Sequence, residues 1–146
     1  LYVNSPYGIC MAHNGNLTNT DKLRNDITQV DLRHLNTDSD TEVLLNVFAN
    51  ELQVQGKLAP ESSDIFAAVE NVHRRCRGAY AVVGLVANIG LFAFRDQFGI
   101  RPLCFGKRAS KYGIEYAVSS ESAAFDYLGF KLIRDLNPGE ALFIAS

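Results

Sequence analysis

The periodicity of the chain changes near residue 78, and this change restricts the fold more than any other feature. Before residue 78, apolar residues recur at helical spacing, and after it short apolar or β-branched runs alternate with turn residues. Several of the later runs are apolar almost throughout, which is typical of a sheet covered on both faces. Helices followed by strands predict an α+β fold in which antiparallel sheets lie inside and helices outside.

Apolar stripes and turn residues define the individual elements. The expected helices span residues 20–28, about 40–52 and 62 onward to Gly78, and the expected strands span 8–12, 79–86, 90–94, 102–106, 116–119 and 141–144. Leu23 and Ile27 lie one turn apart and should face the core. The run Asp38–Glu42 supplies caps and negative charge at the start of the second helix. Residues 29–37 are polar and are expected to form a loop.

Composition excludes several classes of protein. The 146 residues are 47% hydrophobic and 21% charged, with a net charge of −2, as in an ordinary globular protein and not in a nucleic-acid binder. No apolar run approaches the roughly 18 residues that cross a membrane. The three cysteines, Cys10, Cys76 and Cys104, form no CxxC pair, so we expect reduced, mostly buried thiols without a disulfide or a zinc site. A cytoplasmic protein follows by default.

The segment around Asn14 and Gly15 joins the first expected strand to a helix start at 18–21. Glycine exposes its backbone N–H, and the asparagine amide is a second neutral donor, so the pair is suited to an oxyanion hole, where donors meet a developing negative oxygen. Asn-Gly is also the commonest two-residue hairpin turn. On this pair alone, both interpretations stay open.

Five stretches resemble the glutamine amidotransferases of the N-terminal-nucleophile type. The run 13–19 is HNGNLTN and continues as DKLR at 21–24, residues 94–103 are FRDQFGIRPL, and residues 119–124 and 133–140 are SSESAA and IRDLNPGE. Within the family they are most similar to the phosphoribosyl branch. The resemblance covers nearly the whole chain.

This resemblance implies a fold and three site residues. The implied fold is the four-layer αββα sandwich of antiparallel sheets flanked by helices, incomplete here at its N-terminus. Asn14 and Gly15 would form the oxyanion hole for the carboxamide of glutamine. Asp40, in the run Ser-Asp-Thr-Glu, would bind the α-amino group of glutamine, whereas its role without the resemblance would be helix capping.

The nucleophile of the family is absent from the sequence. The resemblance implies a cysteine at the first position of the mature chain, with its own α-amino group as the base, and position 1 is Leu1. Cys10 is expected to be buried and to have no catalytic role. Both termini suggest a cut, so we expect residues 1–146 to be part of one glutaminase domain with no internal boundary. The fragment alone is expected to be inactive.

For the complete protein, the resemblance implies hydrolysis of glutamine to glutamate. The ammonia would pass to phosphoribosylpyrophosphate to give 5-phosphoribosylamine, in the first committed step of purine biosynthesis. A covalently linked phosphoribosyltransferase domain would bind that substrate with magnesium, and the protein would be a homo-oligomer. No cofactor or metal is expected in these residues, and no nucleic-acid or membrane partner. A sibling amidotransferase with another acceptor and a non-catalytic glutamine-binding or assembly module remain alternatives.

Other charged residues have structural interpretations. In the run 94–103, Arg95, Asp96 and Arg101 around Gly99 are expected to form an ion-paired hairpin. Glu121 is expected to cap a short helix at 122–127. We assign no role to the histidines: His73 is placed on a solvated helix end, and His13 could line the pocket beside Asn14.

Overall fold

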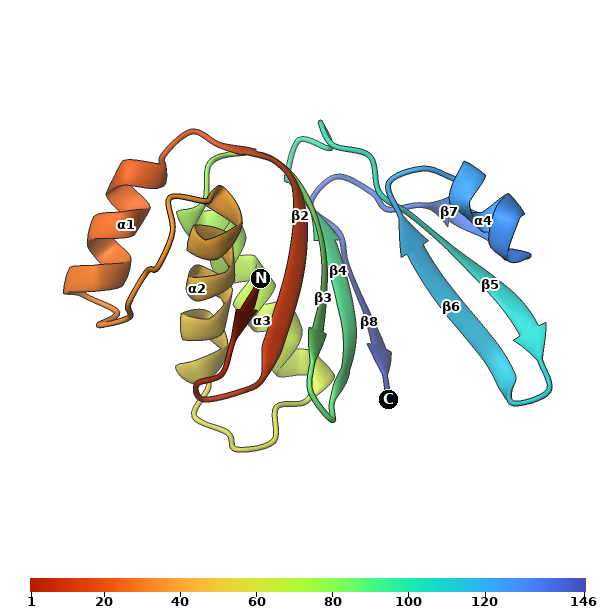
Figure 1. The fold of residues 1–146 in the computed structure, drawn as a ribbon, viewed down its shortest axis with the longest axis horizontal. Coiled ribbons are helices and arrows are strands. Elements are labelled where there is room, and N and C mark those ends of the chain that lie inside the picture. Colours follow the sequence, from red (N-terminus) through yellow and green to blue (C-terminus); the bar gives the residue numbers. More distant parts are fainter.

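The computed structural model describes residues 1–146 as stacked layers of helices and sheets (Figure 1). Three helices cover one face of a five-stranded sheet, a three-stranded sheet lies against part of the other face, and a short helix lies beyond it. All strand pairs are antiparallel. The expected α+β class, with antiparallel sheets between helices, is confirmed.

The three covering helices begin where the sequence predicts. They are α1 (Thr20–Gln29), α2 (Asp40–Gln53) and α3 (Ser62–Arg75). Leu23 and Ile27 of α1 are buried as expected, and α2 is the central helix, with ten buried residues. In α3, Ile65, Val69 and Val72 are buried, whereas Phe66, which is apolar as well, is 43% exposed.

The five-stranded sheet has the strand order β1-β2-β3-β4-β8. Its members are β1 (Tyr2–Val3), β2 (Ile9–Leu17), β3 (Gly78–Val86), β4 (Gly90–Arg95) and β8 (Ala141–Ala145). The prediction that Gly78 ends the preceding helix is wrong: α3 ends at Arg75, and Gly78 opens β3 opposite Leu17 with φ +136°. A Cβ at Gly78 would overlap the carbonyl oxygen of Asn16, so the two strands can approach only with glycine there.

The three-stranded sheet has the order β6-β5-β7. It consists of β5 (Cys104–Ser110), β6 (Gly113–Ser119) and β7 (Lys131–Asp135), with α4 (Ala123–Leu128) between the last two in sequence. The strands expected from the sequence do not include β7. Every residue of β7 is exposed, so a sheet covered on both faces describes β3 and β4 but not this strand. No side chain caps α4, so Glu121 does not have the expected capping role.

Aromatic rings from α2, β3 and β4 form the centre of the main core. Phe48 stacks on Phe92 at a centroid distance of 4.4 Å, and Phe94 lies next to both rings. His73 is buried here, with Nδ1 2.8 Å from the hydroxyl oxygen of Tyr80. Its expected place on a solvated helix end is therefore wrong, because His73 is on the apolar side of α3 while its arginine neighbours are not.

The two sheets meet over a small second core and then diverge (Figure 1). Ala81, Ala93, Leu103 and Leu136 fill the contact. Near the start of β2, Cys10 is exposed and lines an apolar hollow of about 300 Å³. The expected burial of Cys10 is wrong, because alternation along β2 turns Met11 toward the helices and Cys10 away from them.

Candidate active site

Asn14 and Gly15 lie inside β2 and not in a turn. The ladder with β3 runs without interruption from Ile9 opposite Val86 to Leu17 opposite Gly78. The hairpin interpretation of Asn-Gly is therefore wrong, and so is the expectation that the strand ends at this pair. The extended partner strand outweighs the local turn preference of the dipeptide.

Gly15 is the one residue type that fits this position. Its φ is +148°, in the region that favours glycine, and a Cβ would overlap the carbonyl oxygen of Ala79 and lie 2.8 Å from Cα of Tyr80. Glycine thus allows β2 and β3 to approach closely beside Asn14.

The backbone N–H of Gly15 points to the open edge of the sheet. Hydrogen bonds at the two ends of the ladder, from Thr18 N to Arg77 O and from Ala87 N to Gly8 O, show that even-numbered positions of β2 face β3. Odd-numbered positions face the other way, as the bond from Leu17 N to the Oδ2 of Asp40 shows. Within residues 1–146, β1 pairs only with residues 9 and 10 of β2, so no strand of this chain pairs with the edge at Gly15.

The side chain of Asn14 is on the sheet face that is turned away from the helices. It is exposed and lines a cavity of about 150 Å³ with Ala12, His13, Ala81, Val83, Leu103 and Ser120, so His13 lies beside this pocket as expected. The amide of Asn14 makes no hydrogen bond within the protein, so both of its N–H groups are free to donate to a ligand. The backbone N–H of Gly15 and the side-chain amide of Asn14 are thus two neutral donors, without partners in the protein, at adjacent positions of β2.

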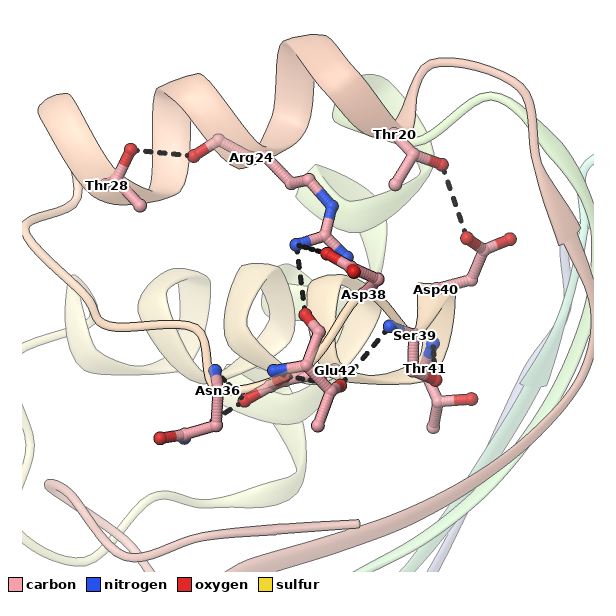
Figure 2. A network of polar contacts seen from close by, with 10 residues as sticks. Thr20, Arg24, Thr28, Asn36, Asp38, Ser39, Asp40, Thr41 and Glu42 are labelled. Atoms are coloured by element: carbon pink, nitrogen blue, oxygen red, sulfur yellow. Dashed lines mark hydrogen bonds and ion pairs between the residues drawn. The ribbon is translucent and has the colours of Figure 1, made fainter.

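Asp40 opens α2 but does not cap it. The cap is Ser39, whose Oγ accepts from the backbone N of Thr41 at 3.2 Å. Asp40 instead accepts from Leu17 N at 2.8 Å through Oδ2, and its Oδ1 lies 3.4 Å from the hydroxyl of Thr20 (Figure 2). One carboxylate oxygen is therefore fixed to the edge of β2, two residues from Gly15, and the other has only a long contact.

The loop before α2 is held in place by Glu42. Its carboxylate accepts from the backbone N of Asn36 and of Thr37 at 2.8 and 2.6 Å, and from both side chains (Figure 2). Burial by itself raises the pKa of Glu42, but these four bonds outweigh it, and the pKa lies below its ordinary value. Arg24 of α1 donates to the carbonyl of Thr37. The start of α2 is thus built on an ordered loop.

His13 lies on the helix side of β2, next to Asn14 in sequence. Its Nδ1 is 3.3 Å from Oγ1 of Thr41, while its Nε2 is buried without a partner. Burial lowers the pKa of His13, Asp40 raises it, and Arg101 lowers it further, with a net shift downward. The imidazole is therefore neutral at pH 7, and its neighbours include both the carboxylate of Asp40 and the guanidinium of Arg101.

The run 94–103 forms the turn between β4 and β5, and Asp96 organises it. Both carboxylate oxygens accept two backbone N–H groups each: Oδ1 from Tyr80 and Arg101, Oδ2 from Phe98 and Ile100. Arg95 donates to the carbonyls of Leu136 and Gly99. The expected structural role is confirmed, but the expected ion pairs are wrong: backbone carbonyls accept from the two terminal nitrogens of Arg95, and backbone N–H groups donate to Asp96.

The structure places the N–H of Gly15 and the carboxylate of Asp40 on one edge of β2, and the side chain of Asn14 on the adjoining sheet face. Sequence reasoning did not find the bond between Asp40 and Leu17, nor the contact of His13 with Thr41. Leu17 and His13 each lie two residues from Gly15 on the same side of β2, and this spacing was the sequence signal that could have indicated both contacts.

No helix is both long and apolar enough to span a bilayer.

This arrangement accompanies a clear family match. Residues 2–127 match the glutamine amidotransferase domain family, and the chain belongs to that family.

Among its relatives are the amidophosphoribosyltransferases of Pseudomonas aeruginosa and Escherichia coli. They are 60% and 52% identical to this chain over 143 and 144 residues, or 98% of it. The chain spans 28% of the length of these curated relatives.

A solved structure of glutamine phosphoribosylpyrophosphate amidotransferase from B. subtilis, complexed with ADP and GMP, has a similar fold. It has a TM-score of 0.76 and 28% identity, and the match covers 100% of this chain and 29% of that one. A structure described as the allosteric regulatory enzyme of purine biosynthesis gives a TM-score of 0.74 at 28% identity.

Proposed function

We propose that this chain is the glutamine-hydrolysing part of an amidotransferase, with Asn14 and Gly15 as the oxyanion hole and Asp40 as the partner of glutamine's α-amino group. One observation carries the proposal. The N–H of Gly15 and the carboxylate of Asp40 lie on the same edge of β2, and the free amide of Asn14 is on the next residue of that strand. A carboxamide and an ammonium group, at opposite ends of glutamine, require such donors and such an acceptor.

The proposed chemistry starts with attack of a thiolate on the carboxamide carbon of glutamine. The electron pair of the C=O double bond moves to oxygen, and Asn14 and Gly15 donate hydrogen bonds to the resulting anion. As this intermediate collapses, the proton that the α-amino group of the terminal cysteine took from the thiol passes to the departing nitrogen, so ammonia leaves and a γ-glutamyl thioester remains. Water then hydrolyses the thioester to glutamate and restores the thiol. The thiolate is assigned to the terminal cysteine that the family resemblance implies. The buried Cys76, whose pKa burial raises to about 12, is unsuited to that role.

For the complete protein, we propose amidophosphoribosyltransferase activity. Ammonia from glutamine would pass to phosphoribosylpyrophosphate and form 5-phosphoribosylamine, in the first committed step of purine biosynthesis. The relatives at 47–60% identity, all named amidophosphoribosyltransferases, support this acceptor over that of a sibling enzyme. Residues 1–146 are then one part of a glutaminase domain without an internal boundary.

The same proposal includes the remaining partners. A linked phosphoribosyltransferase domain would bind phosphoribosylpyrophosphate with magnesium, in a cytoplasmic homo-oligomer. This chain has no group of three or more His, Cys, Asp or Glu side chains that could hold a metal ion, so no step above uses one.

The test is Asn14→Asp in the complete protein, which replaces a neutral donor by a negative acceptor of nearly the same shape. Glutamine hydrolysis should fall by a factor on the order of 100 to 1,000, the effect of losing one oxyanion donor. Synthesis from free ammonia should be unchanged, because ammonia does not use this site. Asn16→Asp is the matched control, since Asn16 is exposed two residues further along the same face of β2. Retained hydrolysis in Asn14→Asp would refute the assignment.

A further inference from the structure

His13 and Leu17 connect β2 to two consecutive residues of α2. Leu17 N donates to Oδ2 of Asp40 at 2.8 Å, and Nδ1 of His13 lies 3.3 Å from Oγ1 of Thr41. These two residues of β2 flank Gly15, at equal spacing on either side. The start of α2 is therefore attached to β2 on both sides of Gly15, the proposed oxyanion donor.

Two attachments constrain a helix end more than one does. With only the bond between Leu17 and Asp40, the first turn of α2 could pivot about that single point. The contact between His13 and Thr41 restricts this freedom and, with it, the place of Asp40 relative to Gly15. The other polar contacts at this helix end do not join it to β2: Glu42 holds the preceding loop, and the hydroxyl 3.4 Å from Asp40 belongs to Thr20 of α1.

The surroundings of His13 fit a structural contact made by a neutral ring. The imidazole is half-buried with its Nε2 enclosed, and the residue also lines the small cavity beside Asn14. The charged groups facing it are Asp40 from α2 and Arg101 from the turn before β5. Either neutral tautomer can pair with a hydroxyl, which both donates and accepts.

We propose that His13 is a positioning residue: through Thr41 it sets the place of Asp40 relative to Asn14 and Gly15, and so determines affinity for glutamine and not the rate of its chemistry. The inference rests on the proposed function of this site. It assigns to His13 a role distinct from those of the donors and of the carboxylate.

The test uses steady-state kinetics of the complete protein with glutamine and, separately, with ammonia. His13→Leu and Thr41→Val each remove the contact and should raise the KM for glutamine on the order of 10-fold, as expected for one lost hydrogen bond. The kcat with glutamine and the ammonia-dependent rate should change less than about 2-fold. The double variant should resemble each single one, because all three lack the same contact.

Conservative variants distinguish this role from general support of the fold. His13→Asn, which keeps a polar atom near the position of Nδ1, and Thr41→Ser, which keeps the hydroxyl, should restore a KM near that of the unmodified protein. His34→Leu changes an exposed histidine of the loop before α2 and should have no effect.

Three results would overturn the role of His13: an unchanged KM in His13→Leu, multiplied effects in the double variant, or equal losses with both nitrogen sources. A complete unmodified protein that hydrolyses no glutamine would instead overturn the proposed function itself. The two failures are therefore distinguishable.

Discussion

Asp96→Asn should destabilise the turn between β4 and β5 more than any other substitution of equal size. The carboxylate of Asp96 is fully buried and accepts four backbone N–H groups at 2.9–3.2 Å, two on each oxygen. An asparagine keeps one acceptor oxygen and presents an NH₂ group to the other pair of donors. Two N–H groups then lose their acceptor, at about 1–3 kcal/mol each, so the expected loss is about 2–6 kcal/mol.

The pH dependence of this contribution follows from the pKa of Asp96. Burial raises that pKa, but the four backbone bonds outweigh burial and place it below its ordinary value. The stabilisation is therefore fully present above the unfolded pKa of about 3.9 and is lost as pH falls below it, through the lowered folded pKa. The difference between the unmodified protein and Asp96→Asn should accordingly shrink below about pH 4.

Hydrogen exchange measured by mass spectrometry locates the effect, and urea denaturation measures its size. In Asp96→Asn, the amides of Phe98, Ile100 and Arg101 should exchange faster by a factor on the order of 10 to 1,000 at neutral pH. Asp126→Asn is the control, since Asp126 is exposed on α4. Unchanged exchange at residues 98–101, with a stability within about 0.5 kcal/mol of the unmodified protein, would refute the role given to Asp96.

Two further predictions concern the site and the thiols. In the complete protein, Asp40→Asn should keep the bond to Leu17 N through its amide oxygen but lose the negative charge, raising the KM for glutamine about 10- to 100-fold while ammonia-dependent synthesis is unchanged; equal losses with both substrates would point to folding. In this chain, a maleimide should label the exposed Cys10 first and the buried Cys76 last, because burial raises the pKa of Cys76 to about 12; mass mapping of the labelled peptides that found Cys76 first would contradict this order.

Periodicity was sufficient to predict the helices and most strands. The buried side of α1 can be identified from the spacing of Leu23 and Ile27, and that of α2 from its row of apolar residues, without reference to the rest of the chain. The strand β7 could not be found in this way, because all five of its residues are exposed and its place depends on pairing with β5. The same limit applies to His73 of α3, because its burial depends on contacts with Tyr80 of β3 and Phe94 of β4.

The site residues could be named from the sequence, but their geometry could not. Asn-Gly has a strong local preference for a turn, and only the nine-residue ladder with β3 keeps it extended. Asp96 illustrates the same point for charge. A sequence shows an acid between arginines and favours an ion pair, whereas the folded turn brings four backbone donors to the acid instead.

The open edge of β2 connects the fold to the proposed chemistry. An uncovered strand edge exposes backbone donors and acceptors to other chains, and proteins usually cover or shorten it. Here Leu1 covers the N–H of Met11, and Asp40 covers that of Leu17, so the gap between them contains the odd-numbered positions 13 and 15. The same contacts that limit the exposed edge therefore place the N–H of Gly15 where an oxyanion could bind.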